Sequence, residues 1–274
     1  MDGLEPGGTA ILPADLAQTP ILTAKARAMA VKTILFGTDP QADFRLISVQ
    51  ISGDVTIVRA THGAAPILCK VRSPGRHFAA NALGALAVAD ALGLDPVIAA
   101  SDIGHWAPPP GRGVRERIVL DLVEETSFDL IDDAYNANPA SMAASLDVLI
   151  ATLPQHGMGR IGNGRRIAVL GDMLELGPTE AALHAAIARH PGLAAIDIIH
   201  CVGPRMKTLF AALPRAQRGD WVATAPELAA RARHLIDAGD IVLVKGSKGA
   251  KVSLVVDGLR KLGQPTATPA EGTE

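Results

Sequence analysis

The stretch that decides the fold reads LIDDAYNANPASM and runs from Leu130 to Met142. Apolar residues precede it at 118–123 and again at 128–131, and these runs predict a strand. Apolar residues at helical spacing follow it to residue 153, which predicts a helix. The acidic and amide side chains therefore lie where a strand ends and a helix begins. In an open α/β sheet, ligands bind at that position.

The polar residues of this stretch leave two interpretations open. Asp132 and Asp133 can accept hydrogen bonds from ribose hydroxyls or hold a metal ion. Asn136 and Asn138 tolerate a left-handed turn and can bond a ligand or the backbone, and Pro139 suits the first position of a helix. The alternative is a capped turn that binds no ligand. The spacing alone favours neither interpretation.

Composition limits the class of protein. The 274 residues suffice for one large domain or two ordinary ones, and the net charge of −2 gives no bulk attraction to nucleic acid or anionic membrane. No apolar run reaches membrane-spanning length, and the N-terminus lacks a signal-peptide pattern. Cys69 and Cys201 lie in apolar runs, so we expect buried free thiols in a cytoplasmic protein.

The first part of the chain predicts a mixed, partly antiparallel sheet. Its strand patterns fall at 9–12, 33–37, 44–49, 55–60 and 67–71, with a helix over about 15–30. The string SPGRHFAAN at 73–81 then leads into an apolar helix. A glycine-basic turn before a helix can hold an anion or a nucleotide. His77 and Asn81 share one face of that helix, where ordinary helix caps are the simpler alternative.

The second part predicts a doubly wound α/β domain. A linker, PPPGRG at 108–113, resists helix and sheet and marks the boundary. Strands are predicted at 128–132, 167–170, 198–202, 221–223 and 241–244, alternating with helices at 141–153, 179–190, 205–213, 226–238 and 248–262. This alternation indicates a mostly parallel sheet. We therefore predict domains at 1–111 and 112–263, followed by a disordered tail at 264–274 that is rich in Pro, Thr and Glu.

Several strings together resemble the Mur ligases, above all those that add D-alanyl-D-alanine to UDP-N-acetylmuramoyl-tripeptide. They are DDAYNANPASM at 132–142, GDMLELG at 171–177, SPGRHFAAN at 73–81 and KGSK at 245–248. The resemblance runs from about Gly7 to Leu262. It implies a partial central Mur-ligase ATPase domain followed by a Rossmann-like C-terminal domain. The chain departs from the family pattern at Phe78 and Ser253, and Lys248 replaces an arginine.

The resemblance also implies a set of binding residues. His77 and Asn81 would contact the adenine of ATP, Asp133 the ribose and Arg112 the phosphates. The residues implied to face the amino-acid substrates are Tyr135, Asn136, Asn138, Asp172, Lys245, Ser247 and Lys248. His184 falls where the family places a histidine. The resemblance assigns no catalytic residue with certainty and no metal ligand within this chain.

The implied reaction is ATP- and Mg²⁺-dependent amide formation in peptidoglycan synthesis. The tripeptide carboxylate becomes an acyl phosphate, which the amine of D-alanyl-D-alanine attacks. The chain has no phosphate-binding loop of the form G-x-x-x-x-G-K-[ST], so we expect a truncated ligase. One alternative is a non-catalytic nucleotide-binding remnant or interaction module that pairs with a P-loop-bearing partner chain. Another is a different Mur or folate polyglutamate ligase. We expect neither nucleic acid nor membrane as a partner.

Overall fold

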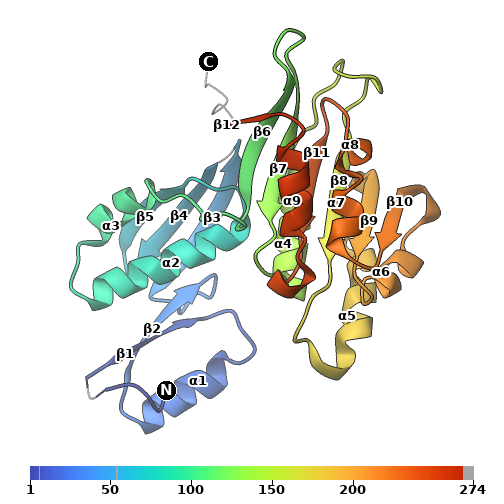
Figure 1. The fold of residues 1–274 in the computed structure, drawn as a ribbon. Coiled ribbons are helices and arrows are strands. Elements are labelled where there is room, and N and C mark those ends of the chain that lie inside the picture. Colours follow the sequence, from blue (N-terminus) through green and yellow to red (C-terminus); the bar gives the residue numbers. More distant parts are fainter. Residues whose placement is uncertain (6, 54, 268–274) are drawn as a thin grey trace. The chain divides into compact units, whose positions relative to one another are not determined.

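The computed structural model describes residues 1–5, 7–53 and 55–267 (Figure 1). It divides into two compact units, Met1–Ala107 and Pro108–Glu274. We call them the N-terminal and C-terminal units. The division, between residues 107 and 108, lies at the start of the proline-rich linker 108–113. The sequence predicts the boundary a few residues later, at 111/112.

The described residues of the N-terminal unit form a five-stranded sheet in the order β1-β2-β3-β4-β5. The strands are β1 Thr9–Pro13, β2 Lys32–Gly37, β3 Phe44–Ser52, β4 Val55–His62 and β5 Ala65–Val71. The pairs β1–β2 and β2–β3 are parallel, whereas β3–β4 and β4–β5 are antiparallel. The prediction of a mixed sheet is confirmed.

The helices of this unit are α1 Thr19–Ala28, α2 Arg76–Ala91 and α3 Pro96–Ile103. Helix α2 lies across the sheet (Figure 1), and its buried face carries Ala79, Leu83 and Leu86, none of them exposed. Their spacing of four and three residues places them on one side of the helix. Helix α3 was not predicted. It begins at Pro96, and the Asp95 side chain accepts a hydrogen bond from the Val97 amide.

The described residues of the C-terminal unit form a seven-stranded sheet in the order β10-β9-β8-β11-β7-β6-β12. The strands are β6 Val114–Asp121, β7 Thr126–Asp133, β8 Arg166–Gly171, β9 Ile198–Val202, β10 Arg218–Val222, β11 Ile241–Lys245 and β12 Gln264–Ala267. The five strands from β10 to β7 are parallel, and β6 and β12 are antiparallel at one edge. The predicted α/β class is confirmed.

Residues 264–267 correct the prediction of a disordered tail. They pair with residues 116–119 of β6 as the antiparallel strand β12. The backbone groups along the edge of β6 need hydrogen-bond partners, and this short segment supplies them. The remainder of the predicted tail, residues 268–274, lies outside the described residues.

Helices cover both faces of the C-terminal sheet. On one face lie α4 Pro139–Ala151, α5 Glu180–Ala186 and α6 Lys207–Ala212; on the other lie α7 Ala225–Ala229, α8 Ala232–Leu235 and α9 Ser253–Arg260 (Figure 1). The helix predicted over 248–262 is interrupted. A single 3₁₀ turn, Lys248–Ala250, ends at Lys251, whose φ of 55° is left-handed and cannot continue a right-handed helix. The helix predicted over 226–238 is likewise divided into α7 and α8.

No described helix is long and apolar enough to cross a bilayer. The two cysteines are free and buried, as predicted, with Cys69 in β5 and Cys201 in β9.

Both thiols are expected to resist alkylation in the folded protein. Burial raises the pKa of Cys69 to about 11 and that of Cys201 to about 12. Because the thiolate is the nucleophile, only about one molecule in a thousand, or fewer, is reactive at pH 8. Mass spectrometry after N-ethylmaleimide treatment at pH 8 should show no adduct on the native chain and two on the denatured chain. A rapid native adduct at either cysteine would contradict the burial.

Candidate functional site

The register of strand pairing places the ends of β7 and β11 side by side at the carboxyl edge of the C-terminal sheet. In the parallel pair β7–β11, Asp133 lies opposite Lys245 and Asp132 opposite Val244. Successive side chains of a strand point to opposite faces. Asp133 and Lys245 therefore share the face covered by α4, and Asp132 points to the face covered by α9. Carboxyl ends of strands are where open α/β sheets bind ligands.

The ammonium of Lys245 is held within the protein. Its side chain is 2% exposed, and Nζ lies 2.7 Å from Oδ2 of Asp133. Nζ also donates to the Asn136 carbonyl at 3.0 Å. The Ser145 hydroxyl, on α4, donates to the same Asp133 oxygen at 2.5 Å. Oδ1 of Asp133 has no hydrogen-bond partner among the described residues, so it remains available to a ligand.

Asp132 takes no part in this cluster. Its carboxylate accepts from Arg260 of α9 at 2.9 Å and from the Ala134 amide at 3.3 Å. Arg260 also donates two hydrogen bonds to Glu116 of β6. Burial raises the pKa of Asp132, although the Ala134 amide and Arg260 oppose that effect. Asp132 therefore ties α9 to the β6–β7 hairpin, and of the two aspartates only Asp133 is left to contact a ligand.

Two cations lie beside one exposed aromatic ring at the same end of the sheet. The guanidinium carbon of Arg112 is 4.2 Å from the ring centroid of Tyr135, and Nζ of Lys248 is 5.9 Å from it. The Tyr135 amide also donates to the Gly111 carbonyl at 3.0 Å, which anchors the loop that carries Arg112. Among the described residues neither cation forms an ion pair with a carboxylate. Such a pair of charges suits an anionic group.

Asn138 is the N-cap of α4, as the capped-turn interpretation predicts. Its Oδ1 accepts from the Ser141 amide at 2.8 Å, and the Ser141 hydroxyl accepts from the Asn138 amide at 3.0 Å. This reciprocal pair is a capping box. Asn136 uses its Oδ1 on the Ala137 amide at 2.9 Å. Both asparagines thus shape the turn that carries Tyr135.

We expect Asn138→Ala to lower the free energy of unfolding by about 1 kcal/mol, because the first turn of α4 loses its cap. Asn138→Asp keeps the accepting oxygen and should stay within about 0.5 kcal/mol of the parent protein. Urea unfolding followed by circular dichroism measures both. Equal stability of the alanine and aspartate variants would show that the cap contributes nothing.

Asp172 and Ser247 join the loops that follow β8 and β11. The carboxylate of Asp172 is buried and accepts from the Met206 amide at 2.9 Å. The Asp172 carbonyl accepts from the Ser247 amide at 3.0 Å. The Ser247 hydroxyl accepts from the Leu174 amide at 2.9 Å and lies 3.3 Å from the Ala137 carbonyl. The side chains of Asp172 and Ser247 therefore support the loops around the site through internal hydrogen bonds.

His184, like Asp172 and Ser247, has a supporting role. It is fully buried on α5, and its Nε2 accepts from the Met173 amide at 2.9 Å. Its Nδ1 lies 2.7 Å from the Glu180 carbonyl, which places the ring proton on Nδ1. His184 thus fastens the loop after β8 to α5.

The N-terminal unit holds the other two predicted residues, His77 and Asn81, on the first turns of α2. Asn81 is exposed and lines a cavity of about 440 Å³ together with Phe78 and Trp106. The rings of Phe78 and Trp106 are 5.8 Å apart, and the His77 ring lies 4.1 Å from that of Phe78. An apolar hollow with aromatic walls and an amide at its edge suits a flat heterocycle.

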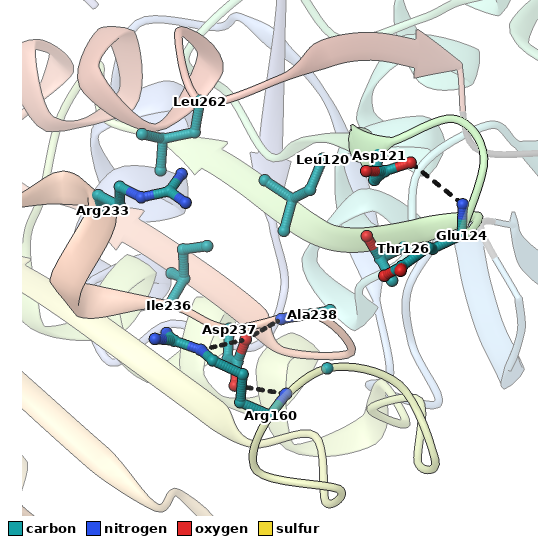
Figure 2. A pocket seen from close by; sticks show the side chains of 11 residues that line it. Leu120, Asp121, Glu124, Thr126, Arg160, Arg233, Ile236, Asp237, Ala238 and Leu262 are labelled. Carbon is teal, nitrogen blue, oxygen red and sulfur yellow. Dashed lines mark hydrogen bonds and ion pairs between the residues drawn. The ribbon is translucent and has the colours of Figure 1, made fainter.

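A second cavity in the C-terminal unit, of about 340 Å³, lies at the amino ends of β7 and β11 (Figure 2). Its carboxylates bind their own loops. Oδ2 of Asp237 accepts from the amides of Arg160 and Ile161, each at 3.1 Å, and Asp121 accepts from the Glu124 amide at 3.1 Å. None of the predicted site residues lines this cavity.

The described residues contain no group of three or more His, Cys, Asp or Glu side chains that could hold a metal ion. We assign the Mg²⁺ implied by the resemblance no ligand among these residues.

Sequence reasoning missed Ser145. The buried face of α4 is formed by Met142, Leu146 and Leu149, each at most 1% exposed. Ser145 lies on that face and is itself 7% exposed. A hydroxyl on an otherwise apolar helix face needs a buried partner. A serine on an apolar helix face was the signal in the sequence that position 145 has a buried partner. The sequence does not identify that partner.

Comparison with known proteins finds Mur ligase domains in both units of the chain. Residues 1–89 match the family model of the Mur ligase middle domain, and residues 120–248 match that of the Mur ligase glutamate ligase domain. The chain is 30% identical over 226 residues to the UDP-N-acetylmuramoyl-tripeptide--D-alanyl-D-alanine ligase of Escherichia coli. That match covers 81% of this chain and 45% of the relative, so the chain spans less than half of its length.

Solved structures share the fold. MurF from Acinetobacter baumannii superposes with a TM-score of 0.76 at 22% identity, covering 94% of this chain and 52% of that one. MurF ligase from Thermotoga maritima, solved in complex with ADP, gives a TM-score of 0.71 at 20% identity and covers 93% and 54%.

Proposed function

The chain belongs to the Mur ligase family, and from that premise we propose that it carries the nucleotide- and substrate-binding parts of an ATP-dependent ligase. In the proposed reaction, D-alanyl-D-alanine is joined to UDP-N-acetylmuramoyl-tripeptide through an acyl phosphate during peptidoglycan synthesis. The observation that carries the proposal is the placement of Arg112, Lys248 and Asp133 at the carboxyl ends of β7 and β11.

Each unit contributes distinct groups. In the C-terminal unit, Oδ1 of Asp133 is free to accept from ribose hydroxyls, and Arg112 is free to bind phosphate oxygens. In the N-terminal unit, Asn81 offers an amide to the adenine edge, and the cavity beside it offers aromatic surface from Phe78 and Trp106. His77 lies against Phe78 and extends that surface.

The remaining residues divide into contacts and supports. Tyr135 and Lys248 are exposed enough to contact a substrate carboxylate or phosphate. Asn136 retains its side-chain amide nitrogen for the same purpose. In contrast, Asn138, Asp172, Lys245 and Ser247 are engaged in internal hydrogen bonds, and we assign them the support of the site.

The chemistry that these residues supply is positioning and charge stabilisation. When ATP is bound, it supplies the phosphoryl group that activates the tripeptide carboxylate. Phosphoryl transfer spreads negative charge over the transferred oxygens, and preorganised cations stabilise it. Arg112 is suited to this because the ring of Tyr135 orients it without neutralising it.

Residues 1–274 contain no G-x-x-x-x-G-K-[ST] string, and a second candidate accounts for nucleotide binding without it. In that candidate the chain is a non-catalytic nucleotide-binding remnant or interaction module, which would require a P-loop from a partner chain. In a third candidate, the chain is part of a different Mur ligase or of a folate polyglutamate ligase. This candidate differs from the first only in the substrates that the ligase accepts.

Calorimetric titration with ATP tests the nucleotide part of the proposal. We expect Arg112→Ala to weaken ATP binding about tenfold or more, because one charge-assisted phosphate contact is lost. The matched control is Arg233→Ala, which removes the same charge beside the opposite cavity and should leave the affinity unchanged. Equal weakening by both variants, or no binding by the parent chain, would contradict the assignment.

Phosphate release then tests the reaction. The chain is incubated with ATP, Mg²⁺, UDP-N-acetylmuramoyl-tripeptide and D-alanyl-D-alanine, with and without a separately expressed P-loop-bearing segment of a Mur ligase. Release that requires both substrates and that segment supports the proposal. Binding without release under any combination supports the non-catalytic candidate, and release with a different amino acid supports the third.

A further inference from the structure

We propose that Ser145 is a positioning residue for ribose recognition: its hydroxyl, together with the ammonium of Lys245, holds Oδ2 of Asp133 and leaves Oδ1 for the ligand. The inference rests on the proposed role of Asp133 in binding the ribose of ATP, and it adds a residue to which neither the motifs nor the comparisons assign a role.

The clamp is made of two donors that come from different elements. Ser145 lies on α4, with Oγ 2.5 Å from Oδ2 of Asp133 and 2.9 Å from the Ser141 carbonyl. Lys245 ends β11, with Nζ 2.7 Å from the same Oδ2. If the carboxylate rotated by half a turn, both oxygens would exchange places. Rotation about the Cβ–Cγ bond carries Oδ2 away from both donors, so the two hydrogen bonds favour one orientation of the carboxylate.

The helix and the strand that carry the two donors are themselves anchored. Met142, Leu146 and Leu149 anchor α4 in the core, and the capping box at Asn138 fixes its first turn. Lys245 is fixed by strand register opposite Asp133 and by the Asn136 carbonyl at 3.0 Å. A carboxylate held in one orientation offers a constant acceptor, which is what recognition of a diol requires.

Packing alone does not explain a serine at this position. Alanine has the higher helix propensity and buries no polar group. The other buried positions of the same helix face are apolar. A buried hydroxyl is stabilising only where it has a partner, and here the partner outside its own helix is the carboxylate of Asp133. The shorter of its two contacts, 2.5 Å against 2.9 Å to the Ser141 carbonyl, is the one to Asp133.

The test compares the affinities of ATP and 2′,3′-dideoxy-ATP by calorimetry for the parent chain, Ser145→Ala and Ser145→Thr. The parent should bind ATP about tenfold more tightly than the dideoxy nucleotide, as expected for hydrogen bonds to a charged acceptor. Ser145→Ala should bring the two affinities within about threefold of each other while leaving that for the dideoxy nucleotide unchanged. Ser145→Thr, which keeps the hydroxyl, should restore the preference. Ser101→Ala, an exposed helical serine, serves as the matched control.

Each outcome decides the matter. If Ser145→Ala keeps the parent's preference for ATP, the hydroxyl does not position Asp133. If the parent binds both nucleotides equally, Asp133 does not read the ribose, and the inference fails while nucleotide binding stands. If the parent binds neither nucleotide, the proposed function fails together with the inference.

Discussion

Replacement of Lys245 by methionine is expected to lower the free energy of unfolding of the C-terminal unit by about 3–5 kcal/mol. Methionine is close to lysine in length and is apolar, so the strand packing of β11 is retained. What is lost is the cation 2.7 Å from Asp133 and the donor to the Asn136 carbonyl. The carboxylate of Asp133, whose side chain is 18% exposed, would lose its counterion. An uncompensated charge in such surroundings is costly.

The double variant Lys245→Met/Asp133→Asn separates this cost from simple loss of contacts. Because it removes both charges, it should recover a large part of the stability lost in the single variant. Lys261→Met, at the exposed end of α9, is the matched control and should change stability by less than about 0.5 kcal/mol. Urea unfolding monitored by the two tryptophans, one in each unit, assigns the effect to a unit. A loss below about 1 kcal/mol for the single variant would contradict a buried pair.

This expectation differs from the role that the resemblance gives Lys245. A lysine in a glycine-rich loop after a strand is readily interpreted as a ligand for a substrate carboxylate. In the structure its head group is enclosed, with two internal acceptors. Lys248, three residues later, is the cation that remains near the surface of the site.

The sequence predicts much of the fold because its periodic segments are short and clearly bounded. Strand β9, at Ile198–Val202, has the predicted bounds, and the alternation of strands and helices predicts the parallel sheet. The segments that it missed depend on tertiary contacts. Helix α3 packs against β5 and α2, and β12 forms by pairing with the edge of β6. Neither has a strong local pattern of its own.

The site is predicted less completely, for a physical reason. Motifs place Asp132 and Asp133 at a strand end, but only strand register and helix coverage decide which one faces which layer. Asp133 and Lys245 are 112 residues apart and become neighbours because β11 pairs with β7. A sequence shows which polar groups are present at a site. It does not show which of them already have internal partners, as Asn138, Asp172 and Ser247 do in the structure.

A loss of similar size, about 3–5 kcal/mol, is expected for Asp240→Ala at the amino end of β11. The Asp240 side chain is fully buried. Its carboxylate accepts from the Arg165 guanidinium at 2.6 and 3.2 Å, from the Arg165 amide at 2.8 Å and from the Asp237 amide at 2.6 Å. The hydrogen bond to Asp240 is also the main cause of the raised pKa of Arg165. Alanine at this position would leave two backbone amides and one guanidinium without their acceptor.

Asp220→Ala is the matched control, because it also removes an aspartate that pairs with an arginine. The Asp220–Arg231 pair is separated by 3.5 Å, and its side chains are 43% and 55% exposed. Solvent screens such a pair, so its loss should change the unfolding free energy by less than about 1 kcal/mol. The two variants share the same substitution and the same change in net charge. A several-fold larger loss for Asp240→Ala, measured by urea unfolding, would therefore isolate the contribution of burial and backbone hydrogen bonding, whereas equal losses would show that Asp240 does not hold the entry to β11.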